Sequence, residues 1–189
     1  MSVLANAKKK DWKLRYGDLL ISGFVHRHFV RNIYTDIILI LSPNYTHYKY
    51  LKFFEKNFKG YIFCEKPPVV SLNQLYNLNN NPKKTFFNFN LRHSKVFSIL
   101  KEVIKKKKLG RIYHAYVSSS HLFGKNVSYK KSWRSKKRLN KLGLIENVGI
   151  HYIDLFSVLF DKPELILHSS NNLLKNTNAY DNCSVFIKY

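Results

Sequence analysis

The stretch from Asp36 to Ser42, with the sequence DIILILS, constrains the fold more than any other part of this chain. Its five central residues are all isoleucine or leucine, without the alternation of a strand that has one side facing solvent. Such a run is typical of a strand in a parallel sheet, which is buried on both faces. Because parallel strands need a crossover between them, the run predicts an α/β fold with right-handed connections.

The residues around this strand fit the α/β interpretation. Apolar side chains recur at three- and four-residue spacing over residues 47–57, which predicts a helix, and Tyr61–Cys64 predicts the next strand. The later strands are longer and alternate, which indicates a second α/β unit. In chain order, the remaining patterns predict a helix at 71–78, a strand at 84–90, a helix at 94–108, a strand at 112–121, a basic loop at 123–141, a helix at 144–160, and strands at 164–169 and 184–189.

The charge of the chain raises the question of a nucleic-acid partner. Its 189 residues include 33 Lys and Arg against 11 Asp and Glu, a formal net charge of +22, and clustered cations bind phosphates. A basic nucleic-acid-binding protein is therefore one alternative. However, the charge is dispersed, with short clusters at 8–10, 105–108 and 136–138, and lysine far outnumbers arginine, which base recognition favours. We expect solvated basic faces and no specific nucleic-acid partner.

Cysteine content and hydropathy indicate the compartment. The two cysteines, Cys64 and Cys183, are too few to cross-link a small secreted domain, which favours a reducing environment. No apolar run approaches the ~20 residues that a membrane-spanning helix needs. The expectations are a cytoplasmic location and no membrane span.

Three short clusters lie where an α/β fold places functional residues. Ser42-Pro43-Asn44 and Glu65-Lys66-Pro67 follow two successive strands, and ligands of open parallel sheets bind beyond the carboxyl ends of the strands. The third cluster is helical, and its Asn147 and His151 are four residues apart, which places them on one face of an α-helix. The other histidines show no metal-ligand spacing, so no metal site is expected.

These clusters resemble the motifs of one known family. SPNYTH at 42–47, CEKP at 64–67, SWR at 132–134 and GIHYID at 149–154 follow the order and spacing of the glucose–fructose oxidoreductase, inositol dehydrogenase and MocA (Gfo/Idh/MocA) oxidoreductases. Within this family, SWR combined with Asn147 looks most like the oxidases of UDP-linked N-acetyl sugars in surface-polysaccharide pathways. Most other members have Asp where this chain has Asn147.

The resemblance implies hydride transfer between a sugar or nucleotide-sugar hydroxyl and the nicotinamide of NAD or NADP. In this reaction Lys66 would polarise the substrate oxygen or handle its proton, His151 would be the general base, and Asn147 would orient the substrate or the histidine. A partly desolvated lysine can have its pKa lowered toward the working range. Without the resemblance, the simpler interpretation of His151 is a core histidine, and that of Lys66 is a lysine in a turn.

The same resemblance assigns residues to the cofactor. Trp133 and Arg134 would close over the nicotinamide end, although Trp133 can also serve only as a packing anchor. Asp154 is expected to cap or pair within the fold. The residues that would line the ribose and nicotinamide are Ser42, Pro43, Asn44, His47 and Glu65.

The resemblance also implies the domain organisation of this α/β chain. It predicts a partial Rossmann-type parallel sheet at 36–91, the C-terminal part of a dinucleotide-binding domain, and an incomplete substrate domain with a larger mixed sheet at 92–189. Residues 1–35 remain unassigned. No G-x-G-x-x-G turn is present, and this turn binds the cofactor's pyrophosphate, so we expect weakened NAD(P) binding.

Relative to the family, the chain is expected to be shortened at both ends. A final strand at 184–189 would leave a sheet edge open to another chain. Besides a sugar or nucleotide-sugar substrate, the expected partner is therefore a second copy of the chain or a complementing chain. The alternative to an active enzyme is a non-catalytic remnant that serves as an interaction module.

Overall fold

The strand predicted at residues 36–42 is present in the structure, a computed structural model that describes residues 36–79, 81–175 and 177–189. These residues form two units, the first ending at Asn88 and the second beginning at Phe89, and each is described by itself. The first contains a parallel sheet and the second an antiparallel one, which confirms the predicted α/β fold class. The unassigned segment 1–35 lies outside the described residues.

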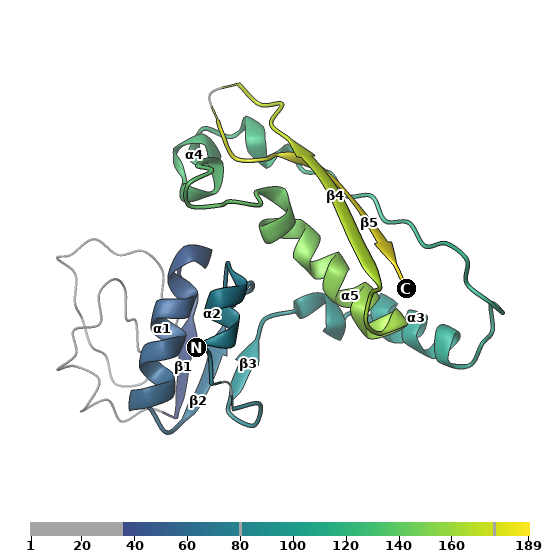
Figure 1. Cartoon of the computed structure of the whole chain (residues 1–189), viewed down its shortest axis with the longest axis horizontal. Coiled ribbons are helices and arrows are strands. Elements are labelled where there is room, and N and C mark those ends of the chain that lie inside the picture. The colour runs from purple at the N-terminus through teal and green to yellow at the C-terminus, as the bar shows by residue number, and fades with distance from the viewer. Residues whose placement is uncertain (1–35, 80, 176) are drawn as a thin grey trace. The chain divides into compact units, whose positions relative to one another are not determined.

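The first unit is a three-stranded parallel sheet with two helices (Figure 1). Its strands lie in the order β1–β2–β3, and both neighbouring pairs are parallel. The first helix begins three residues before the predicted start, because the Thr46 N–H bonds to the Pro43 carbonyl at 2.8 Å and opens the helix directly after the proline. The elements in chain order are β1 (Ile37–Ile40), α1 (Asn44–Asn57), β2 (Tyr61–Cys64), α2 (Leu72–Tyr76) and β3 (Thr85–Phe87).

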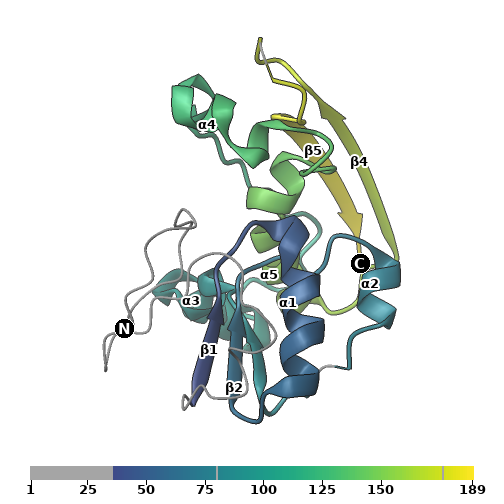
Figure 2. The same cartoon turned by 90° about the vertical axis from the view of Figure 1, so that its left-hand side faces the viewer.

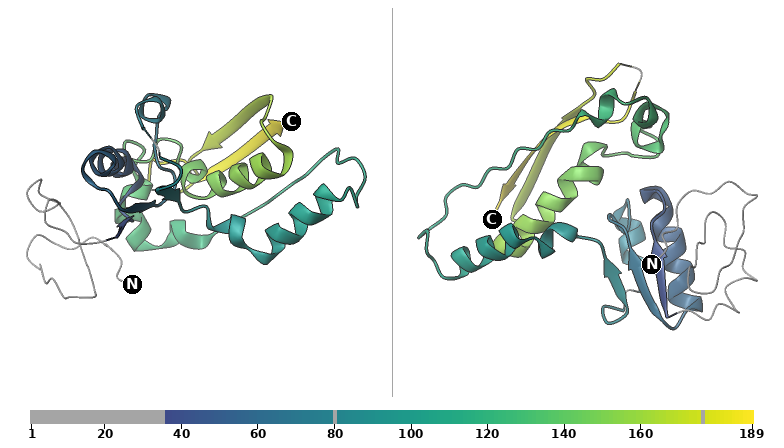
Figure 3. Two further views of the ribbon diagram at one scale, coloured as in Figure 1. Left: turned by 90° about the horizontal axis from the view of Figure 1, so that it is seen from below. Right: turned by 180° about the vertical axis from the view of Figure 1, so that it is seen from behind.

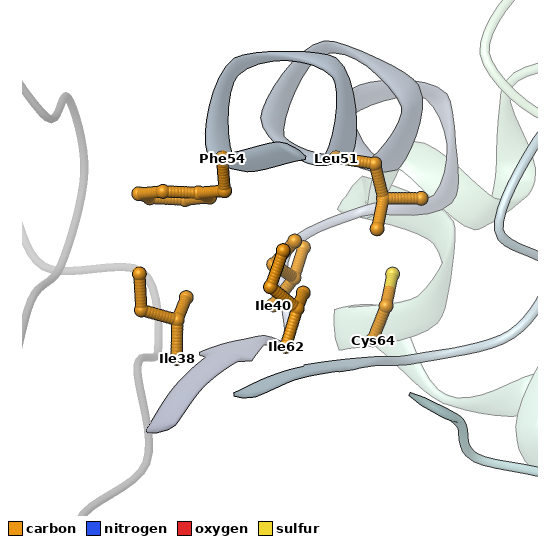
Figure 4. Packing of buried hydrophobic residues seen from close by; sticks show 6 residues of the cluster. All are labelled: Ile38, Ile40, Leu51, Phe54, Ile62 and Cys64. Carbon is orange, nitrogen blue, oxygen red and sulfur yellow. The ribbon is translucent and has the colours of Figure 1, made fainter. Parts of the chain in front are cut away.

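Helix α1 covers one face of this sheet and encloses the hydrophobic core (Figures 2 and 4). Leu51 and Phe54 of α1 are 0% and 4% exposed, and they point at the strands. Full burial of a side chain of this size contributes about 2 kcal/mol to folding. The whole buried cluster consists of Ile38, Ile40, Leu51, Phe54, Ile62 and Cys64.

The second unit consists of helices and a β-hairpin. Strands β4 and β5 pair antiparallel, from Leu165 opposite Lys188 to Asn171 opposite Asn182. Figure 3 shows α5 alongside this hairpin, and the Phe160 ring of α5 lies 5.4 Å from the Tyr189 ring. The elements are the 3-10 helix Asn90–His93, α3 (Lys95–Lys105), the 3-10 helix Leu122–Lys125, α4 (Val127–Lys131), the 3-10 helix Trp133–Ser135, the π-helix Ile145–Gly149, α5 (Ile150–Phe160), β4 (Leu165–Asn171) and β5 (Asn182–Lys188).

Two of the predicted helices begin at serine caps. The Ser71 side chain accepts the Gln74 N–H at 3.3 Å, and the Ser94 side chain accepts the Phe97 N–H at 3.1 Å. Each bond satisfies a donor that the first turn of a helix leaves without a partner. Beyond the end of α3, Gly110 has φ +65°, a left-handed conformation that suits glycine. Within the described ranges, no helix is both long and apolar enough to cross a membrane.

The prediction of a strand at residues 112–121 is wrong, because the chain is irregular there. The alternating pattern that suggested a strand is real, but Tyr113 and Tyr116 are 85% and 82% exposed. Among the described residues, no strand pairs with this segment. A strand needs a neighbour for its backbone groups, and without one the alternation alone does not fold the segment.

The basic segment 123–141, predicted as a loop, contains short helices. The Asn126 side chain accepts the Ser128 N–H at 2.9 Å at the start of α4, and the Ser132 side chain accepts the Arg134 N–H at 3.3 Å at the next turn. Such local caps begin a helical turn without an apolar pattern. The sequence pattern therefore missed these turns.

Replacement of Leu51 by alanine tests the core of the first unit. We expect Leu51→Ala to lower the free energy of unfolding by about 3 kcal/mol, because it removes a fully buried side chain and leaves a cavity. The matched control is Leu72→Ala in α2, where the side chain is 67% exposed and the loss should be small. Urea denaturation followed by circular dichroism measures both. Equal losses in the two variants would contradict the described packing.

Candidate functional site

Polar side chains follow all three parallel strands of the first unit. Ser42 and Asn44 follow β1, Glu65 and Lys66 follow β2, and Asn88 follows β3. Because the strands are parallel, their carboxyl ends share one edge of the sheet. The Asn88 side chain donates to the Glu65 carboxylate at 2.6 Å, so two of these strand ends are directly joined. Asn88 was not among the predicted site residues, because it falls inside the strand predicted at 84–90 and follows the strand only in the structure, where β3 ends at Phe87.

Helix α1 begins at this same edge of the sheet. Its cap residue, Pro43, makes no side-chain capping bond, and a helix N-terminus carries partial positive charge. Asn44 is only 7% exposed, and its Nδ2 has no hydrogen-bond partner among the described residues. The start of α1 therefore presents a buried donor that an acceptor on a ligand could use.

The hydroxyl of Ser42 is held by the first turn of α1. The Thr46 Oγ1 lies 2.6 Å from the Ser42 Oγ and 2.6 Å from the Pro43 carbonyl oxygen. These contacts restrict the rotamers of both hydroxyl side chains. Ser42 is thus preorganised at the end of β1.

His47 lies inside the protein, behind this edge. Its side chain is 0% exposed, with Nδ1 2.7 Å from the Pro67 carbonyl oxygen and Nε2 2.6 Å from the Ser42 carbonyl oxygen. Both ring nitrogens thus face backbone groups of this chain. That His47 lines the cofactor stays a prediction.

Lys66 lies in the loop that follows β2. Its backbone is held on both sides, because the Glu65 N–H bonds to the Ile40 carbonyl at 2.9 Å and the Pro67 carbonyl faces His47. The Lys66–Pro67 peptide bond is cis. Lys66 is half-buried, so it contacts both protein and solvent.

Asn147 and His151 lie in the long helical segment of the second unit. The structure has a π-helical turn at Ile145–Gly149, so Asn147 lies in the π turn and His151 in the first turn of α5. The two residues therefore lie in different kinds of helical turn, and that they share one face of the helix stays a prediction. Asn147 Nδ2 donates to the Gly143 carbonyl at 2.9 Å. The His151 ring meets the Phe89 ring edge to face, with 6.5 Å between the ring centroids.

Trp133 and Arg134 lie in a turn that buried polar side chains hold in place. The Arg134 guanidinium lies over the Trp133 ring, 4.6 Å from its centroid. Ser135 is 3% exposed and donates to the Lys130 carbonyl at 2.7 Å, and the fully buried Asn140 donates to the Arg134 carbonyl at 2.7 Å. The turn is therefore anchored from within while Arg134 remains exposed.

The structure pairs Asp154 with Arg92, which confirms the expected role of Asp154 within the fold. Arg92 Nε donates to Asp154 Oδ2 at 2.6 Å, and the second guanidinium nitrogen reaches the other carboxylate oxygen. This bidentate pair raises the pKa of Arg92, chiefly through the hydrogen bond to Asp154. It ties the 3-10 helix Asn90–His93 to α5, the helix that carries His151.

The described residues offer little for metal binding or for thiol chemistry. In the part of the chain that the structure describes, no three His, Cys, Asp or Glu residues are grouped so that they could hold a metal ion. Cys64 is buried in the core under α1, and burial, followed by the charge of Glu65, raises the pKa of its thiol. The thiol therefore stays protonated and unreactive.

Two family models match the chain. Residues 7–86 match the oxidoreductase family with an NAD-binding Rossmann fold, and residues 97–189 match the C-terminal domain of GFO/IDH/MocA proteins. The first match includes the strand ends that carry Asn44 and Lys66, and the second includes Trp133 and His151. The chain belongs to the Gfo/Idh/MocA oxidoreductase family.

Solved structures share this fold. An inositol dehydrogenase homologue from Azotobacter vinelandii, complexed with NAD+, is 18% identical with a TM-score of 0.63, and the match covers 80% of this chain and 42% of that chain. An Agrobacterium radiobacter oxidoreductase in complex with NAD+ is 15% identical (TM-score 0.71; 90% and 49% covered). The WlbA dehydrogenase from Bordetella pertussis, in complex with NADH and UDP-GlcNAcA, is 16% identical (TM-score 0.68; 89% and 49% covered). The chain spans about half the length of these structures.

The ion pair of Arg92 and Asp154 is open to a double-mutant cycle. From Arg92→Gln, Asp154→Asn and the double variant, we expect a coupling free energy of about 1 kcal/mol, because the pair is bidentate and Asp154 is only 10% exposed. The matched control is the surface pair Lys106–Glu102, where both side chains are more than half exposed and the coupling should be smaller. Urea denaturation measures all variants. A smaller coupling for Arg92–Asp154 than for the surface pair would exclude a structural role.

Proposed function

We propose that this chain is an NAD(P)-dependent oxidoreductase that transfers hydride between a sugar or nucleotide-sugar hydroxyl and nicotinamide. The observation that carries this proposal is the row of polar groups at the carboxyl ends of β1 and β2, on a fold whose family binds NAD. We place the reaction in the cytoplasm, in the synthesis of sugars for surface polysaccharides. The WlbA dehydrogenase, solved with NADH and UDP-GlcNAcA, supports a substrate of this class.

The residues at the sheet edge fit the ribose and nicotinamide part of the cofactor. Asn44 contributes a buried amide donor, Glu65 a carboxylate that can accept hydroxyl hydrogen bonds, and Ser42 a preorganised hydroxyl. We propose that Pro43 and His47 complete this lining and that Trp133 and Arg134 also contact the cofactor. NAD(P), when bound, accepts the hydride from the hydroxyl-bearing carbon of the substrate.

In this proposal two residues handle the substrate hydroxyl. Lys66 donates a hydrogen bond to the hydroxyl oxygen and stabilises the negative charge that develops there as its proton leaves. His151 accepts that proton as the general base, since imidazole takes up protons near neutral pH. Asn147 does not titrate, so its role is to orient the substrate or His151.

The charge distribution supports a substrate that carries a diphosphate. Residues 103–145 contain no Asp or Glu, whereas the segment around Trp133 carries a dense set of cations. An exposed basic surface of this kind attracts phosphate groups and speeds their encounter. The cations of this segment are Lys130, Lys131, Arg134, Lys136, Lys137, Arg138 and Lys141.

We also propose that the chain functions with a second chain, either another copy or a complementing one. Within the described residues, β4 and β5 pair only with each other, so the hairpin has two open edges. Leu167 and Phe186 of the hairpin are 55% and 57% exposed. Open edges and exposed apolar side chains favour association.

Binding of NAD(H) to the purified chain is the experiment that tests the cofactor site. We expect calorimetry to detect binding and Asn44→Ala to weaken it about fivefold, because the variant loses one buried hydrogen-bond donor. The matched control, Asn79→Ala, alters an exposed asparagine and should keep the affinity. A folded chain without NAD(H) affinity would favour a non-catalytic interaction module.

Replacement of Lys66 and His151 tests the proposed chemistry. With a UDP-linked N-acetyl sugar and NAD+, we expect Lys66→Ala and His151→Ala each to reduce kcat at least about 100-fold, because each removes a proton-handling group. Exposed residues of the same types provide the controls, Lys83→Ala and His114→Ala, which should retain activity. Spectrophotometric NADH formation measures turnover. Unchanged rates in both test variants would refute the assignment.

A further inference from the structure

The surroundings of His47 present a mismatch in hydrogen-bond chemistry. The ring is fully buried between two carbonyl oxygens, with Nδ1 2.7 Å from that of Pro67 and Nε2 2.6 Å from that of Ser42. A carbonyl oxygen can only accept a hydrogen bond, whereas a neutral imidazole has one N–H donor. The neutral ring therefore serves one of the two carbonyls, and only the protonated ring serves both.

The two carbonyls belong to the two loops that carry the proposed site. Ser42 lies in the loop between β1 and α1, and Pro67 directly follows Lys66 in the loop after β2. His47 lies between them from the first turns of α1, so its ring is a bridge from one loop to the other. The position of the backbone around Lys66 therefore depends on a bond that this ring makes.

We propose that His47 is a positioning residue that holds the loop bearing Lys66 against the end of β1. The number of carbonyls to which it donates depends on whether one or both ring nitrogens carry a proton. This inference rests on the role proposed above for Lys66. In the neutral state one loop is held and the other carbonyl faces an unprotonated nitrogen. In the protonated state both loops are held.

The surroundings also determine where this change occurs on the pH scale. Burial lowers the pKa of His47 from its ordinary value of 6.5 and outweighs the opposite effects of the two carbonyls and of Glu65. Among the described residues, the charged groups acting on the ring are Glu65, which raises its pKa, and Lys66, which lowers it further. At neutral pH the ring is therefore in its single-donor state, and acidification leads to the double-donor state.

The linkage to stability has a definite sign. The unfolded chain takes up a proton on this histidine at the ordinary pKa, before the folded ring does. Between the two pKa values the unfolded state thus binds more protons, and the free energy of unfolding falls as the pH decreases through this window. Replacement of His47 should remove this part of the pH dependence.

Nuclear magnetic resonance of the unaltered chain tests the proposal without cofactor or activity. We expect proton–nitrogen spectra of the His47 ring to show one protonated nitrogen at neutral pH and two only after acidification below the ordinary pKa of histidine. The backbone amide signals of Glu65 and Lys66 should shift with the same midpoint as the ring, while those of β4 should not follow it. The exposed His114 is the control residue, and the two amide signals should not follow its ring signals. If the two amide signals do not follow the His47 ring, the proposal is overturned.

Two amide variants separate the two bridges. In His47→Asn the amide nitrogen takes the place of Nδ1 and can still donate to Pro67, whereas in His47→Gln it takes the place of Nε2 and can still donate to Ser42. We expect kcat to fall about fivefold further in His47→Gln than in His47→Asn, since only His47→Gln loses the donor that faces the Lys66 loop. Equal effects of the two variants would contradict the proposal. If the chain shows no turnover, the proposed function fails, and the ring and amide titrations still decide the role of His47.

Discussion

The packing of α1 on the parallel strands β1 and β2 is the contact on which the rest of the first unit depends. Leu51 and Phe54 cover the strand side chains so completely that water is excluded from that face. This burial holds the helix N-terminus and the two strand ends at the same edge of the sheet. The polar residues at that edge contribute little to folding, and they can be brought together only because the apolar side chains behind them are packed.

The same helix connects the core to the proposed chemistry. One side chain of its first turns, Asn44, leaves a buried donor unused, and another, His47, is placed between two backbone carbonyls. A polar group that is buried without a hydrogen-bond partner is costly, and the neutral His47 ring can donate to only one of its two carbonyls. Such groups at the carboxyl edge of a parallel sheet indicate function more strongly than stability. In the second unit, buried polar side chains fix a loop, because Ser135 and Asn140 donate hydrogen bonds to the backbone of the turn that carries Arg134.

The sequence predicted those elements whose patterns come from burial or capping. The uninterrupted apolar run predicted β1, the run Tyr61–Cys64 predicted β2, and Ser94 predicted the start of α3. The prediction failed where an element depends on contacts with segments that are distant in the chain. Residues 112–121 alternate like a strand, but nothing among the described residues pairs with them, and the π turn beside His151 has no signature in residue types. Of the candidate site, the motifs could be read directly, whereas Asn88 and the buried position of His47 could not.

The sequence by itself determined the α/β class, the family and the elements of the first unit, because apolar periodicity and short motifs are local and can be recognised without knowing which residues are in contact. Only the tertiary structure decided what each motif residue touches. His47 and Pro67 are 20 residues apart in the chain, and the His47 ring reaches the Pro67 carbonyl only because β1 lies beside β2. The Ser42 carbonyl is nearer in sequence and is reached by the other ring nitrogen. That arrangement is set by the burial of apolar surface, which acts between distant segments and has no direction of its own, so it cannot be read from any one of them.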